Sequence, residues 1–227
     1  MLMLTRYGIF LTLLRAEGLM VALLSHSLFY KIVNILYYRQ FIEDLEMGVE
    51  PKRCIIFSRG NGILGDINVR LMELTNYKYK DCRDSPFVLN HASLLPPTEM
   101  VLAKRASEIS LYLSSNKMLL GIDLDRVDVV IFLHPYNQPA ALIQGGGRGG
   151  RRNDSNMRRR VQVYQLYNAQ DLASSKKQMS PMMRDICLTG ECTRKLMRNY
   201  FVGCNEEGGG KADKYSCCHN CDLKFDL

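Results

Sequence analysis

The chain has 227 residues, of which 47% are hydrophobic, and a formal net charge of +7. This length allows one large domain or a domain with a small appendage, and the apolar content excludes a chain too polar to bury a core. The positive charge favours an acidic partner such as nucleic acid, and much of it lies in residues 148–160.

The first segment, residues 1–31, is apolar but is interrupted by Arg6, Arg15 and Glu17. Its uncharged run, Gly18–Tyr30, is shorter than the roughly 20 residues that a membrane helix needs. No small-residue cleavage site follows it cleanly, so we do not interpret it as a signal peptide. We expect a partly buried helix or the start of an incomplete chain, and no membrane association.

Apolar strand-like runs then alternate with helical patterns over residues 32–170. Helices are predicted at Ile32–Met47, at Ile63–Leu74, after the cap residue Thr98, and at Ala140–Gln144. Strands are predicted at Cys54–Phe57, Phe87–His91, Ile109–Leu113, Val127–Leu133 and Val161–Tyr167. This alternation predicts an α/β fold with a parallel, doubly wound sheet, in which Cys54 is a small core residue.

Two loops of this domain have a functional and a structural interpretation. Ser58–Gly62 follows the first predicted strand, at the kind of strand end where ligands collect in open α/β sheets. Its glycines are equally typical of an ordinary turn, which we favour. His91 is interpreted as a strand-end residue rather than a ligand.

A glycine- and arginine-rich stretch follows the fourth predicted strand. It reads Gln144-Gly-Gly-Gly147-Arg148-Gly-Gly-Arg151. Arginine offers a planar fork of donors that matches phosphate oxygens, and the glycines allow the backbone to pass close to a polyanion. By composition alone, a flexible arginine-rich loop is the alternative interpretation.

The order of a strand, Gly121-Ile-Asp123, a second strand, a helix with Gln144 and the arginine stretch resembles the last two motifs of superfamily 2 helicases. The resemblance is strongest to the RecQ family of ATP-dependent DNA helicases. It implies that residues 32–170 form the second RecA-like motor domain. It assigns ATP-facing roles to Gly121, Asp123, Gln144, Gly147, Arg148 and Arg151, with Gln144 and both arginines catalytic. The chain departs from the family at Gly145 and Arg152, where acidic residues are usual.

The same resemblance implies DNA contacts. The loop after the third strand carries Ser114 and Ser115, and the corresponding family loop touches the DNA backbone. The cluster Arg158, Arg159, Arg160 could bind phosphates with a strong salt dependence, although such a cluster more often lies on a solvated face.

Residues 178–227 follow a polar linker, Asp171–Lys177, and are rich in cysteine. Met182–Phe201 has helical spacing, with Cys192, Leu196 and Tyr200 on one face. The pair Cys218-x-x-Cys221 has the spacing of two thiolate ligands of one zinc ion.

The RecQ resemblance returns in this segment, in Cys192-Thr-Arg-Lys-Leu196 and in the final cysteine pair. It implies a helical zinc-binding subdomain with structural Zn²⁺ held by Cys192, Cys218 and Cys221. Cys217 is the default fourth ligand and Cys204 competes with it. Free thiols in a loose tail are the alternative.

Neither a phosphate loop nor a plausible acidic magnesium box occurs in the chain. We therefore predict part of a RecQ-type 3′–5′ DNA helicase, acting on single-stranded or forked DNA but not active alone. ATP and Mg²⁺ would bind only with a separate first RecA-like domain. The family also implies nuclear localisation and a role in DNA repair or recombination. The alternative is a non-catalytic, zinc-stabilised nucleic-acid-binding module.

Overall fold

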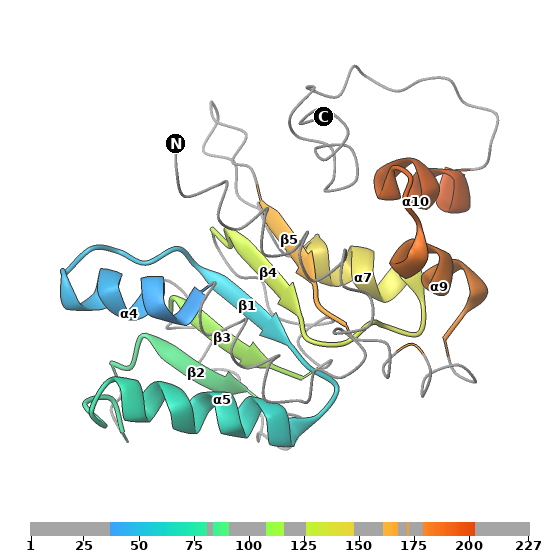
Figure 1. Cartoon of the computed structure of the whole chain (residues 1–227). Helices are drawn as coiled ribbons and strands as arrows, with labels where there is room; N and C mark the ends of the chain where they lie inside the picture. The colour runs from blue at the N-terminus through green and yellow to red at the C-terminus, as the bar shows by residue number, and fades with distance from the viewer. Residues whose placement is uncertain are drawn as a thin grey trace.

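The computed structural model describes residues 37–80, 84–90, 108–115, 126–147, 161–167, 172 and 179–202. Its centre is a five-stranded sheet with the order β2-β3-β1-β4-β5, and every neighbouring pair of strands is parallel (Figure 1). The strands are β1 (Cys54–Phe57), β2 (Phe87–Asn90), β3 (Leu111–Ser114), β4 (Val129–Phe132) and β5 (Gln162–Gln165). The predicted parallel α/β sheet is confirmed.

The three central strands β1, β3 and β4 are buried along their whole length. Such continuous apolar strands are typical of parallel sheets, because the crossover helices cover both faces. Ile55 of β1 pairs with Tyr112 on one side and with Val130 on the other. Cys54 is fully buried, as the sequence predicted, and burial raises the pKa of its thiol well above the ordinary value.

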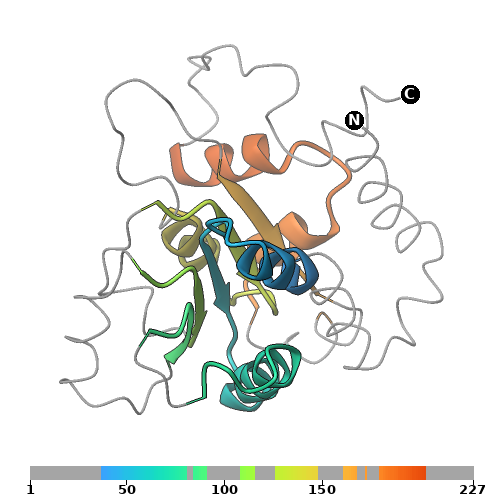
Figure 2. The ribbon, with the colours of Figure 1, turned by 90° about the vertical axis from the view of Figure 1, so that its left-hand side faces the viewer.

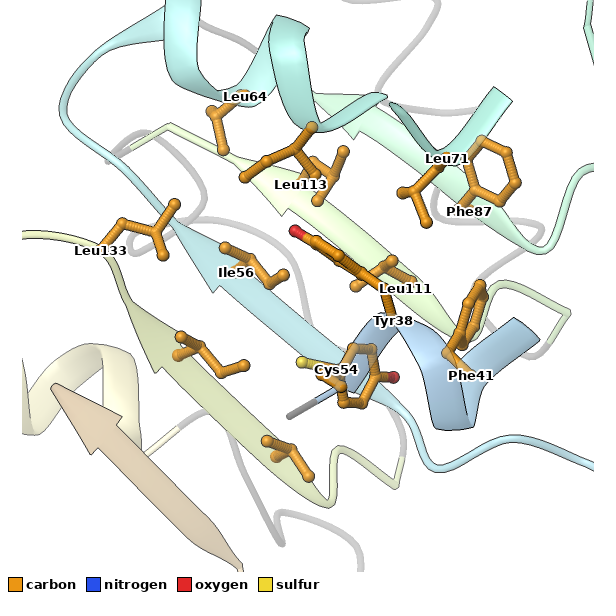
Figure 3. Close-up of a cluster of buried hydrophobic side chains, with 14 residues drawn as sticks. Tyr38, Phe41, Cys54, Ile56, Leu64, Leu71, Phe87, Leu111, Leu113 and Leu133 are labelled. Carbon is orange, nitrogen blue, oxygen red and sulfur yellow. The ribbon is translucent and has the colours of Figure 1, made fainter. Parts of the chain in front are cut away.

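One face of the sheet is covered by α4 (Arg39–Glu46) and α5 (Asn61–Leu74). Leu64, Ile67 and Leu71 recur at helical spacing and form the buried side of α5. They join Phe41 and the side chains of Cys54 and Ile56 in one apolar cluster, which Figure 3 shows from the α4 and α5 side. α4 ends at Glu46, and Gly48, one residue beyond its C-cap, has a φ of 68°, a left-handed conformation that glycine adopts without strain.

The other face is covered by α7 (Pro139–Gly146) and α9 (Pro181–Leu188). Leu142 and Met183 are buried in a second cluster with Phe57 and Phe132, whose rings stack 5.4 Å apart. Figure 2 shows α7 on the side of the sheet opposite to α4 and α5. The helices that follow β1 and β4 therefore lie on opposite faces, which makes the sheet doubly wound.

The C-terminal helix differs from its prediction. A single helix was expected over Met182–Phe201, whereas the structure has two, α9 and α10 (Thr193–Val202). Thr189 leaves the helix with φ −62° and ψ 139°, and its hydroxyl accepts the N–H of Glu191 at 2.9 Å. Glycine at position 190 is a poor helix former, and this threonine turn satisfies the backbone locally. The apolar period continues across the break, which is why spacing alone predicted one helix.

Several smaller boundaries also shift. α5 begins at Asn61, so Asn61 and Gly62 lie in its first turn and not in a loop. The predicted cap Thr98, His91 and the segment 1–36 lie outside the described residues. In the part of the chain that the structure describes, no helix has the length and apolar character needed to cross a bilayer.

Candidate functional site

The carboxyl ends of all five strands meet at one edge of the sheet, because the strands are parallel. β1 and β4 are neighbours, yet the chain leaves them towards opposite faces, through α5 and α7. Ligands of open α/β sheets bind outside the carboxyl ends of strands at such a switch point. We therefore describe the carboxyl edge between β1 and β4 as the candidate site.

A side-chain bridge spans this switch point. The guanidinium of Arg59, just after β1, donates from Nη2 to Oδ1 of Asn137 at 2.7 Å. The carbonyl of Asn137 accepts the N–H of Ser180, the N-cap of α9, at 2.8 Å. Asn137 therefore holds together the segments that follow β1 and β4 and the start of α9. Arg59 itself is exposed, so its guanidinium is accessible to an anionic ligand.

The start of α5 lies beside this bridge. Its N-cap, Gly60, has an extended conformation and makes no side-chain cap hydrogen bond, while its own N–H is donated to Oγ of Ser58 at 3.2 Å. The first amides of a helix have no intrahelical partner, and the helix dipole places partial positive charge there. With 14 residues, α5 has a full dipole at the edge that carries Arg59. This combination suits a phosphate group.

Tyr136 lies close enough to Arg59 to feel its charge. It is buried, its ring packs edge-on against Phe132 at 5.1 Å, and its hydroxyl makes no hydrogen bond with the described residues. Burial raises the pKa of this phenol well above its ordinary value, and the charge of Arg59 offsets part of that shift. Tyr136 is therefore a neutral hydroxyl near the switch point at any physiological pH.

The serines predicted to contact DNA lie at the same edge but are buried. The hydroxyl of Ser114 donates to the carbonyl of Ser115 at 2.9 Å, and the carbonyl of Ser114 accepts the N–H of Ser58 at 3.1 Å. In this conformation the Ser114 hydroxyl is engaged with the backbone of Ser115, and the Ser114 carbonyl holds the start of the loop after β1. A direct DNA contact from Ser114 or Ser115 stays a prediction.

The predicted ATP-facing motif is described at its beginning. Gln144 is exposed on α7, and Gly147 ends that helix. A Cβ added to Gly147 would lie 3.0 Å from the carbonyl oxygen of Ile143, a tight contact that a small shift of the backbone could relieve. Gly121, Asp123, Arg148, Arg151 and the cluster 158–160 lie outside the described residues.

One predicted zinc ligand is described. Cys192 precedes α10, and its Sγ accepts the N–H of Lys195 at 3.4 Å. The other four predicted ligands lie outside the described residues: Cys204, Cys217, Cys218 and Cys221. Among the residues that the structure describes, no three metal-ligating side chains lie together.

Comparison with known proteins gives structural similarities only. No protein-family model and no curated protein matches the chain. The DUF1998 helicase MrfA bound to DNA and AMPPNP is similar at 18% identity and a TM-score of 0.43, over 56% of this chain and 17% of that one. The C-terminal part of the Fun30 ATPase domain is similar at 18% identity and a TM-score of 0.45, over 69% of this chain and 50% of that one.

The C-terminal domain of the DEAD-box protein Dbp5 is similar at 19% identity and a TM-score of 0.41, over 60% of this chain and 76% of that one. The chain thus spans about a sixth of the MrfA chain and half of the Fun30 fragment. All three are helicase or ATPase domains by description, and the similarity is one of backbone arrangement.

Sequence reasoning missed Arg59, Tyr136 and Asn137 as site residues. Arg59 was assigned to an ordinary turn, and Asn137 lies 78 positions further along the chain. The available signal was positional, because both residues follow buried strands that a parallel sheet brings to one edge. Only the strand order shows that these two strands are neighbours.

Proposed function

We propose that this chain is the second motor domain of a RecQ-type DNA helicase, followed by a zinc-binding subdomain, and that it is inactive alone. The observation that carries the proposal is the switch point between β1 and β4. There, Arg59, Asn137 and the uncapped start of α5 form a phosphate-binding edge. α7, which holds Gln144, begins at the same place and ends at the glycine that opens the arginine motif.

In this proposal, the carboxyl edge holds the backbone of single-stranded DNA through Arg59 and the first amides of α5. Arg148 and Arg151 would face the phosphates of an ATP molecule bound to a separate first domain, which also supplies the Mg²⁺ ligands. Arginines so placed stabilise the charge that develops during phosphoryl transfer. Closure and opening of the two domains would move the strand in the 3′ to 5′ direction. Nuclear localisation and a role in DNA repair or recombination belong to the same proposal.

Zinc belongs to the proposal as a structural ion. Cys192 would hold it together with Cys218, Cys221 and either Cys217 or Cys204. The position of Cys192 at the start of α10 supports this assignment, since the N–H of Lys195 already points at the sulfur. The ion would tie the C-terminal residues to α10.

The test is complementation. The purified chain is mixed with a separately expressed first RecA-like domain of a RecQ-type helicase, and ATP hydrolysis is followed with single-stranded DNA present. We expect almost no turnover from the chain alone and measurable turnover from the pair. Arg148→Ala and Arg151→Ala should each lower that turnover by roughly 10³-fold. The neighbouring Arg152→Ala is the matched control and should keep it, whereas full activity in Arg148→Ala would remove the assignment.

One observation favours the second candidate, a non-catalytic nucleic-acid-binding module. α10 exposes Tyr200 and Phe201 to 49% and 48%, with their rings 4.9 Å apart, and carries the exposed cations Arg194 and Lys195 in its first turn. Aromatic rings beside positive charges bind single strands by base stacking. If this is the function, Tyr200→Ala should weaken binding to single-stranded DNA, and no first domain should restore ATP hydrolysis.

A further inference from the structure

The opposite edge of the sheet contains a pocket that the proposed function does not use. It has a volume of about 460 Å³ and lies at the amino ends of β1, β4 and β5. Its lining is polar and includes Glu50, Lys52, Arg53, Arg126, Asp128 and Gln162. The volume lies within the range of small-molecule sites, and the polar lining suits a charged ligand rather than an apolar one.

Arg53 is a buried cation in the wall of this pocket. Its side chain is only 9% exposed, and its Nη2 lies 3.4 Å from Oε1 of Glu50, whose side chain is 70% exposed. Charge-assisted hydrogen bonds are usually about 2.7–2.9 Å long. Glu50 is therefore a loose partner, and a ligand oxygen can replace its carboxylate beside the guanidinium.

The backbone around Arg53 is braced. The carbonyl of Arg53 accepts the N–H groups of Asp128 and Val129 at 2.9 and 3.0 Å, and its own N–H is donated to Oδ2 of Asp128 at 3.1 Å. Asp128 is thus engaged with the backbone of the neighbouring strand end. The bracing gives Arg53 a fixed position, and a preorganised cation binds an anion with a smaller loss of entropy.

Arg126 also lines this pocket, and its backbone is strained. Its φ of 59° is left-handed, a conformation that costs a residue with a side chain about 1 kcal/mol and that glycine adopts freely. Residues with a strained backbone cluster at binding sites, so the conformation of Arg126 is consistent with a binding role. Lys52, Arg53 and Arg126 give the pocket three cations against the carboxylates of Glu50 and Asp128.

From this geometry we infer that the amino-edge pocket binds the terminal phosphate of a small phosphomonoester. A terminal phosphate carries about two negative charges and three acceptor oxygens, which matches two guanidinium forks and the amide of Gln162. A phosphodiester within a strand carries only one negative charge, and the strand continues on both sides of it. Free phosphomonoesters and the phosphorylated end of a strand share the recognised group, so the experiment separates the two sources.

Binding of inorganic phosphate, of AMP and of a single-stranded oligonucleotide with or without a 5′-terminal phosphate is measured by calorimetry on the full chain. Arg126→Gly is the main variant, because it removes the guanidinium and places the preferred residue at a left-handed position. It should keep or raise thermal stability and weaken phosphate and AMP binding at least 10-fold. Arg39→Gln, which removes an exposed cation of α4 outside the pocket, is the control and should bind as the unmodified chain does.

Glu50→Gln removes the competing carboxylate and should tighten phosphate binding several-fold, which a purely structural role of Arg53 would not produce. Two results would overturn the inference. The first is that phosphate fails to bind the unmodified chain or binds Arg126→Gly equally well. The second is that Arg126→Gly loses affinity for the unphosphorylated oligonucleotide as much as for AMP, which would assign the pocket to the strand backbone.

Discussion

Removing the bridge between Arg59 and Asn137 should separate a DNA-contacting side chain from a positioning one. The Nη2–Oδ1 distance of 2.7 Å is that of a strong hydrogen bond to a charged group, a class that contributes about 1.5–3 kcal/mol when buried. Arg59 is exposed, so we expect about 1 kcal/mol of positioning energy. Asn137→Ala should therefore weaken binding to single-stranded DNA about 5-fold. Its salt dependence should not change, because the guanidinium is still present.

Arg59→Ala removes the phosphate contact itself. We expect a loss of about 10-fold in affinity, which is about 1.4 kcal/mol, and a decrease of about 0.7 in the slope of log K against log salt. The assay is fluorescence anisotropy of a labelled oligothymidine at several potassium chloride concentrations. The double variant should bind like Arg59→Ala, since Asn137 acts only through the arginine.

Arg70→Ala is the matched control for this cycle. Arg70 is an exposed arginine further along α5, and its guanidinium donates to Glu73 at 2.7 Å. Arg70→Ala therefore removes the same type of side chain at a position away from the carboxyl edge. Two outcomes would refute the reasoning: equal effects of Arg59→Ala and Arg70→Ala, or losses from Arg59→Ala and Asn137→Ala that simply add. Circular dichroism of each variant checks that the sheet is intact.

Three further predictions concern zinc, pH and the arginine cluster. Elemental analysis should find one zinc per chain. The zinc should be lost in Cys218→Ser and in only one of Cys217→Ser and Cys204→Ser, because only the loss of a true ligand releases the metal. A chain purified without metal would refute the zinc proposal. Burial raises the pKa of the Cys187 thiol from 9.0 to about 11, so the unfolded chain loses this proton first. The free energy of unfolding, measured by denaturant titration, should fall by up to about 2 kcal/mol as pH rises from 9 to 11, and by less in Cys187→Ala. An equal pH dependence of this free energy in the two proteins would contradict the prediction. Alanine at residues 158–160 should reduce the slope of log K for DNA binding against log salt by about one unit per lost contact. An unchanged slope would favour the alternative, in which the cluster lies on a solvated face.

The sheet could be predicted from the sequence because its strands carry their own signal. Cys54–Phe57 is buried on both faces, and a continuous apolar run of this length has the same boundaries in the sequence and in the structure. Helix ends were less predictable, because they depend on capping as well as on period. Ser180 caps α9, and Thr189 ends it, within an apolar pattern that continues through both.

Contacts between distant residues could not be predicted in the same way. Arg59 and Asn137 are neighbours only because β4 lies beside β1, and the strand order is a property of the assembled sheet. The same holds for Arg53 and Arg126 at the other edge. No spacing pattern distinguishes a buried arginine from a solvated one, and the left-handed φ of Arg126 is invisible in a sequence where glycine would be the usual signal.

The two proposed sites would bind anions by different means at the two edges of the sheet, and this difference can be measured. At the carboxyl edge the first amides of α5 and its dipole add to Arg59, so part of the attraction belongs to the backbone and survives any side-chain substitution. At the amino edge α4 and α5 place their C-termini, whose partial negative charge repels an anion. Phosphate binding there must come from the side chains of Lys52, Arg53, Arg126 and Gln162, without help from a helix N-terminus. Loss of one guanidinium should therefore weaken binding by about 10-fold at the carboxyl edge and by at least as much at the amino edge, where no helix N-terminus adds to the side chains.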